Sequence, residues 1–256
     1  MNFISLIGIE FKKIRRSKIL FILLAASVIL WIPSILNSDI NFKMQAEGIL
    51  PEYNFLIQGF LGISWFMFPA SIIVSTVLIN QTERSNNGIL KMLAMPVSTS
   101  MLCLAKFIVL SVLAAAQIFM MVVIYYISAA IASNIEDYNF MLPPLFVFKE
   151  AGILLISAIP MAALFWLLSV CIKTPVFSIG TGLAAVVPSV LIINTKIWFA
   201  YPVSYPFYII TAEYSKLSEN MDTAEIQLVP WLPVAVLITV FCLAVSCIYF
   251  GHSERK

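Results

Sequence analysis

Six runs of predominantly apolar residues, separated by shorter polar segments, constrain this chain more than any other feature of its sequence. A helix needs about 17–25 such residues to cross the hydrocarbon core of a bilayer, and each run provides them. Apolar residues make up 61% of the chain and charged residues only 11%, so a water-soluble fold could not cover its surface. The runs are continuous rather than alternating, which argues against a transmembrane β-barrel. We therefore predict an all-α polytopic membrane protein.

The predicted architecture is a single membrane domain, residues 1–256. Its six transmembrane spans are expected at 19–36, 55–80, 101–132, 151–172, 176–193 and 228–250. Pro69, Pro160 and Pro188 interrupt three of the spans, where they either kink packed helices or act as hinges. The longest polar connection, residues 194–227, is too short for a soluble catalytic domain.

Residues 1–18 are expected to form an amphipathic helix that lies on the membrane surface. On a helical wheel one face of this segment is apolar and the opposite face is basic, whereas Ile9 and Glu10 fit neither. The apolar face consists of Phe3, Ile4, Ile7, Phe11 and Ile14, and the basic face of Lys12, Lys13 and Arg16. The charges come too late for a signal peptide and no small-residue cleavage site follows. An ordinary charged flank before the first span is the alternative.

The charge distribution predicts the orientation. With the N-terminus inside, eleven of the 15 lysines and arginines fall in inner segments, and ten of the 13 acidic residues fall in outer ones. Cytoplasmic loops of membrane proteins carry the excess of lysine and arginine. Both termini are therefore expected in the cytoplasm.

The outer connection between the fifth and sixth spans has two unlike parts. Residues 196–210 are aromatic, contain Pro202 and Pro206, and are too short and broken to span. They are expected to dip into the outer leaflet as a broken re-entrant segment packed on protein. Residues 211–227 carry Glu213, Glu219 and two further acids, and are expected to be solvated.

Few residues in the spans suit catalysis or ion coupling. The sequence lacks a phosphate-binding loop, a His-Glu-x-x-His motif and a nucleophile elbow. Its one histidine, His252, lies in the polar tail, and its four cysteines are interpreted as small buried apolar residues. Span interiors hold almost no ionisable groups, with Lys106 and Glu150 nearest to them, so a proton relay is not expected. We predict no catalytic residues, no metal site and no enzyme activity, and energy for transport must come from another protein.

The spans do contain small and weakly polar residues. One interpretation is close helix packing, which such residues favour. The other is a lateral path for an amphipathic substrate. The candidate path residues are Gln58, Ser64, Ser71, Ser75, Gln117 and Tyr125.

The polar segment between the second and third spans, residues 81–100, is predicted to be a cytosolic coupling segment. It is charged, yet it contains the apolar helical phrase Ile89, Leu90, Met92 and Leu93, which suits docking to a soluble partner. Gly88 permits a tight turn before it. After Pro96, Ser98 or Thr99 is the expected N-cap of the third span. An ordinary connecting loop is the alternative.

These features together resemble the ABC type-2 exporter permeases. The resemblance is carried by the basic helix Glu10-Phe11-Lys12-Lys13-Ile14-Arg15-Arg16-Ser17-Lys18, by the six spans, and by the phrase from Glu83 through Gly88-Ile89-Leu90-Lys91-Met92-Leu93-Ala94-Met95-Pro96-Val97-Ser98 to Lys106. In size and overall character the chain looks like the small permease subunits of bacterial lantibiotic-immunity and bacitracin-resistance transporters.

The resemblance implies an assembly of two permease subunits with an ABC ATPase dimer, in which ATP and Mg bind the ATPase. The second permease is either another copy of this chain or a paralogue. The residues implied to couple to the ATPase are Glu83, Arg84, Gly88, Ile89, Leu90, Lys91, Met92, Leu93 and Pro96. The N-terminal helix would contact the same ATPase. The implied outer gate comprises Trp198, Tyr201, Tyr205, Phe207 and Tyr208.

The expected function is a permease subunit of an ATP-driven exporter in the bacterial cell membrane. Its substrate would be a lantibiotic or similar amphipathic antimicrobial peptide, removed from membrane lipid to give self-immunity or resistance. The expected partners include no nucleic acid. The alternatives are a non-transporting membrane scaffold or sensor and an intramembrane lipid-modifying enzyme.

Overall fold

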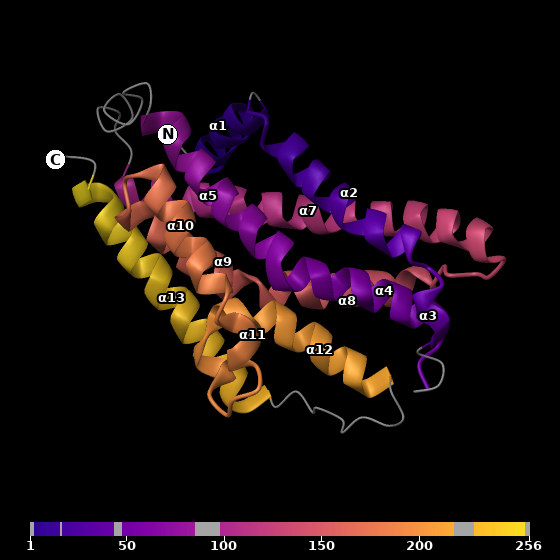
Figure 1. Ribbon diagram of the computed structural model, residues 1–256. Helices are drawn as coiled ribbons and strands as arrows, with labels where there is room; N and C mark the ends of the chain where they lie inside the picture. The colour runs from indigo at the N-terminus through magenta and orange to yellow at the C-terminus, as the bar shows by residue number, and fades with distance from the viewer. Residues whose placement is uncertain (1–2, 16, 44–47, 85–97, 218–227, 254–256) are drawn as a thin grey trace.

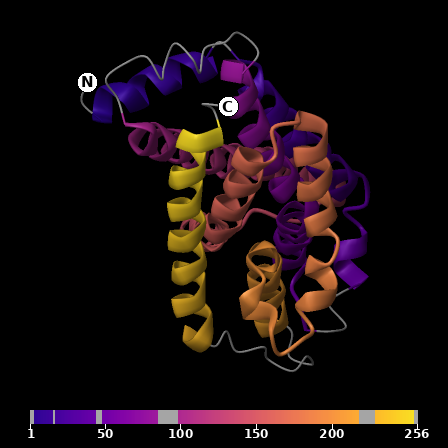
Figure 2. The ribbon, with the colours of Figure 1, turned by 90° about the vertical axis from the view of Figure 1, so that its left-hand side faces the viewer.

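The computed structural model describes residues 3–15, 17–43, 48–84, 98–217 and 228–253. In this part of the chain every regular element is a helix, and six of the helical segments are long and apolar enough to cross a membrane. Figures 1 and 2 show an elongated bundle with α1 (Phe3–Arg15) and the C-terminal end of α13 (Leu228–Ser253) at the same end. The prediction of an all-α fold with six spans is confirmed.

Three of the spans consist of more than one helical piece. The six spans are α2 (Ile19–Leu36); α4 (Pro51–Gly62), η2 (Ile63–Met67) and α5 (Phe68–Arg84); α7 (Thr99–Glu136); α8 (Pro144–Ser157) and α9 (Ile159–Cys171); α10 (Pro175–Val186) and α11 (Ser189–Ile192); and α13. The second and fourth begin earlier than expected because Pro51 and Pro144 each occupy the first helical turn, where a missing N–H costs nothing.

The three broken spans are interrupted beside their prolines, as predicted. The π-helical turn η2 ends just before Pro69, the break at Ala158 comes before Pro160, and Pro188 separates α10 from α11. Proline has no N–H to donate and its ring crowds the preceding turn. The helix therefore changes its hydrogen bonding or direction at each of these points.

Helix α7 is the element around which the others pack. It contacts α1, α2, α5, α8 and α13 along its length, while α9 packs against α13 and α5. In the C-terminal half of α2, the buried Trp31 ring lies 5.6 Å from Phe55 and 5.5 Å from Tyr125, between centroids. A Cβ atom at Gly59 would lie 2.3 Å from the Trp31 ring, so only glycine lets α4 accept this side chain.

Short helices cover the end of the bundle remote from α1 (Figure 1). They are α3 (Ile40–Lys43), the 3₁₀ turns η3 (Trp198–Ala200) and η4 (Pro202–Ser204), and α12 (Tyr205–Leu217). Helix α12 packs against α4 and α8.

The expectation of solvated chain from Thr211 onward was wrong as far as Leu217. Helix α12 continues because Ile210 and Ala212 are buried against the bundle, while Glu213 pairs with Lys216 at 2.7 Å. The other predicted outer acids, Glu219, Asp222 and Glu225, lie outside the described residues.

Candidate functional site

Helix α1 lies across the end of the bundle at which α7 begins (Figure 2). Its buried line is Leu6, Glu10 and Ile14, four residues apart, whereas Phe3, Ile7 and Phe11 are only partly buried. Ile4, expected on the apolar face, is 82% exposed. The expected helix is present, but its buried face lies further round than the wheel placed it, because Glu10, which fitted neither predicted face, is buried.

The Glu10 carboxylate is held by two lysines. Its Oε2 atom lies 2.8 Å from Lys106 Nζ of α7, and its Oε1 atom lies 2.6 Å from Lys13 Nζ, one turn along α1. The Lys106 side chain is completely buried, and only 4% of the Glu10 side chain is exposed. Burial alone would raise the pKa of the Glu10 carboxyl, but Lys106 and then Lys13 hold it below its ordinary value. Two charges that would be costly to bury separately are thus buried as a pair.

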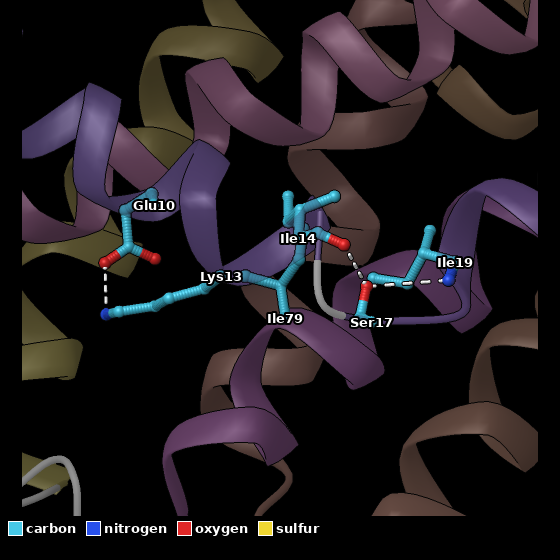
Figure 3. A pocket seen from close by; sticks show the side chains of 6 residues that line it. All are labelled: Glu10, Lys13, Ile14, Ser17, Ile19 and Ile79. Atoms are coloured by element: carbon cyan, nitrogen blue, oxygen red, sulfur yellow. Dashed lines mark hydrogen bonds and ion pairs between the residues drawn. The ribbon is translucent and has the colours of Figure 1, made fainter.

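A turn with its own hydrogen bonds joins α1 to the first span (Figure 3). Ser17 Oγ donates to the Ile14 carbonyl at 2.7 Å and accepts from the Ile19 N–H at 3.5 Å. A small cavity of about 10 Å³ lies here, lined by Glu10, Lys13 and Ile79 of α5 among others. Its volume corresponds to about one water molecule. Ser17 thereby links the end of α1 to the start of α2, while Ile79 of α5 lies beside the same cavity.

The structure describes both ends of the predicted coupling segment, where α5 ends and α7 begins. Glu83 and Arg84 are the last residues of α5. Ser98 is the N-cap of α7, and its side chain accepts a hydrogen bond from the Met101 N–H at 3.3 Å. This confirms Ser98, one of the two expected residues, as the N-cap of α7. The remaining predicted coupling residues lie outside the described residues: Gly88, Ile89, Leu90, Lys91, Met92, Leu93 and Pro96.

The candidate path residues are divided by the structure. Gln117 Nε2 donates to Ser71 Oγ at 2.8 Å, so these two meet between α7 and α5, and Ser71 Oγ in turn donates to the Met67 carbonyl. Ser64 and Ser75 are buried. This arrangement fits helix packing within one subunit.

Tyr125 and Gln58 lie in different surroundings from these. The Tyr125 hydroxyl donates to the Phe140 carbonyl and accepts from the Leu142 N–H, both at 3.1 Å, which holds the connection between α7 and α8. Gln58 is exposed and lines a cavity between α2 and α4. The assignment of all six residues to one substrate path stays a prediction.

Three of the five predicted outer-gate residues, Trp198, Tyr205 and Tyr208, form an aromatic cluster. Trp198 stacks on Tyr208 with ring centroids 3.7 Å apart, and Tyr205 meets both Trp198 and Trp231 of α13 edge-on. The Tyr201 hydroxyl donates to the Ala185 carbonyl of α10. Phe207 lies apart, 6.5 Å from Trp65 of η2 between centroids. The cluster ties α12 and the 3₁₀ turns to the fifth and sixth spans, and its role as a gate stays a prediction.

Sequence reasoning missed the pairing of Glu10 with Lys106. Each residue did carry a signal, because Glu10 fitted neither face of its helix and Lys106 lay about one turn inside an apolar span. Two opposite charges that each fit poorly in their own helix are candidates to form an ion pair with one another. A second missed bond links Asn80 Nδ2 of α5 to Ser169 Oγ of α9 at 2.6 Å.

The fold and this site define a multi-pass membrane protein whose N-terminal helix is ion-paired to the bundle next to an inter-span segment. The family model described as ABC-2 family transporter protein matches residues 6–189. The match spans most of the chain, so the chain belongs to this family and is the permease subunit of an ABC transporter, a class that works with an ABC ATPase. Searches of the curated proteins and of the solved structures gave no match.

Proposed function

We propose that the chain is the membrane subunit of an ABC exporter that removes an amphipathic antimicrobial peptide, such as a lantibiotic, from the bacterial cell membrane. The observation that carries the proposal is the family match over residues 6–189. ATP and Mg bind to the partner ATPase, and the chain itself catalyses no reaction. Two permease subunits, either two copies or two paralogues, assemble with an ATPase dimer.

The proposed energy input is the segment around residues 81–100, on the cytoplasmic side. Two described features support this position. Helix α1 is bound to α7 by the pair of Glu10 and Lys106, and α7 begins at Thr99, next to the Ser98 cap at the end of the segment. A displacement of the coupling segment by the ATPase would therefore reach α7 directly and α1 through the ion pair.

The proposed export route begins in the lipid. In the part of the chain that the structure describes, most of α2 and the outward side of α13 expose large apolar side chains, such as Phe21, Ile29, Leu237 and Phe241. An amphipathic peptide enters the membrane between the lipid headgroups and the acyl chains, because its apolar face favours that boundary. Substrate that is already in the membrane needs no aqueous channel through a single subunit.

Association with an ATPase tests this function first. The chain is co-expressed with a candidate ABC ATPase, and the complex is purified and assayed for ATP turnover. We expect a stable complex whose turnover falls with Glu83→Ala or Leu93→Ala. If the chain never binds the ATPase and ATP turnover is unchanged by both substitutions, the result would favour a non-transporting membrane scaffold or sensor. Conversion of a lipid by the purified chain alone would favour the enzyme.

A further inference from the structure

A cavity of about 400 Å³ lies between α2, α3 and α4, near the end of the bundle away from α1. Its volume is within the range of about 300–1,000 Å³ that is typical of ligand sites. Half of its ten lining residues are polar and none is charged. The polar ones are Ser34, Asn37, Asn41, Asn54 and Gln58.

Amide side chains form the polar wall. Asn54 and Gln58 lie one turn apart on the same face of α4. Asn54 Nδ2 donates to Asn41 Oδ1 of α3 at 2.8 Å, and both residues are buried, so this part of the wall is rigid. The Gln58 side chain is exposed. Asn37 Nδ2 donates to the Pro33 carbonyl at 3.0 Å, which leaves the Asn37 side-chain oxygen as an acceptor.

The rest of the cavity lining is apolar and includes Leu30 of α2 and Phe55 of α4. The neighbouring residues Ile29, Ile32 and Leu36 of α2 are exposed. A Cβ atom at Gly62 would lie 3.3 Å from Leu30 Cδ2. The glycine therefore lets α2 and α4 approach beside the cavity without filling it.

We propose that this cavity, called the groove from here on, binds an uncharged stretch of an amphipathic peptide. The peptide backbone lies against Gln58 and Asn37, and its apolar side chains lie against Leu30. Amide side chains both donate and accept, which matches the N–H and C=O groups of a peptide. A phosphate headgroup is recognised by arginine or lysine and an ammonium group by carboxylates or aromatic faces. The lining has no charged side chain, and its one aromatic ring, Phe55, is only 1% exposed. The proposal rests on the proposed function and locates where the peptide is first bound.

Binding to the purified full-length chain in lipid nanodiscs, without ATPase, tests the groove. The probe is a synthetic amphipathic peptide of leucine, serine and glycine that carries a fluorophore and a diazirine. We expect photo-crosslinks on α2 and α4 around Leu30 and Phe55. Because a hydrogen bond to an uncharged partner is lost, Gln58→Leu should weaken binding about threefold to tenfold.

Two further variants sharpen the test. Ser34→Phe fills the groove and should abolish the crosslinks on α4. Asn134→Leu removes an exposed amide of α7, outside the groove, and should bind like the unsubstituted chain. Folding of each variant is checked by gel filtration before binding is measured.

The groove proposal is overturned if Gln58→Leu binds as tightly as the unsubstituted chain, or if crosslinks map elsewhere. It is also overturned if a diazirine-labelled phosphatidylglycerol or a second copy of the chain occupies the groove and the peptide does not displace it. Its failure differs from failure of the proposed function. If ATP-driven peptide export is unchanged in both groove variants, the groove proposal is wrong and the exporter proposal stands. If the peptide binds but no ATP-driven export occurs, the exporter proposal is wrong and the groove proposal stands.

Discussion

Glu10 of the N-terminal helix and Lys106 of the third span form an ion pair of 2.8 Å, with both side chains almost completely buried. The two residues are 96 positions apart in the sequence. The pair fixes α1 to the helix that follows the proposed coupling segment. Several predictions depend on this relationship and on the neighbouring contacts.

Removing one partner of the pair should destabilise the chain more than removing both. Lys106→Met or Glu10→Gln removes one charge of a buried ion pair, a change that typically costs about 3–5 kcal/mol. The double variant Glu10→Gln/Lys106→Met loses both groups and should recover much of the stability. Thermal unfolding of the detergent-purified chain, followed by gel filtration, measures the three variants. Equal and additive losses would show that the two residues do not act together.

The attachment of α1 should weaken in acid. The pKa of Glu10 is lowered from its ordinary value of 4.5 by Lys106 and Lys13, which outweigh the effect of burial. A carboxyl whose pKa is lowered in the folded chain contributes stability above its ordinary pKa, and that stability is lost as the pH falls through the folded value. Protease cleavage between α1 and α2 should therefore stay slow from neutral pH to about pH 5 and rise below it. The Glu10→Gln variant provides the control, because its cleavage should lack this step.

Loss of the Ser98 cap should loosen the start of α7. Ser98→Ala removes the acceptor of the Met101 N–H and should cost about 1 kcal/mol. Ser98→Asp keeps an acceptor at the same place and is the matched control. Hydrogen exchange of the first turn of α7 measures the change. Exchange that is identical in the two variants would contradict a capping role.

The contact between Gln117 and Ser71 separates packing from transport. Ser71→Ala leaves the buried Gln117 amide without this acceptor and should cost about 1–3 kcal/mol. Ser71→Ala/Gln117→Leu replaces both polar groups and should restore stability. If the pair only packs helices, the double variant also keeps peptide export. Export that is lost in a stably folded double variant would place these residues on the substrate path instead.

The sequence was sufficient for the class, the six spans and the proline breaks, because a bilayer imposes a length and a composition on every spanning helix. Local chemistry also limited the N-cap of the third span to Ser98 or Thr99, and the structure has Ser98 there. It was insufficient for the face that α1 buries, since Glu10 fitted neither face of the wheel and its partner Lys106 lies on a distant helix. The helical course of α12 to Leu217 was missed for a related reason. Ile210 and Ala212 become buried only through contacts with other elements, while the nearby acids made the segment look solvated.

The most direct test of the central claim is ATP-driven movement of a labelled antimicrobial peptide in proteoliposomes that contain the chain and its ATPase. We predict ATP-dependent removal of the peptide from the membrane, lost when Leu93→Ala is introduced although the complex still assembles. Peptide that stays in the membrane while the assembled ATPase turns over ATP, or removal that Leu93→Ala leaves unchanged, would contradict the claim that ATP-derived energy enters through this segment and drives peptide export.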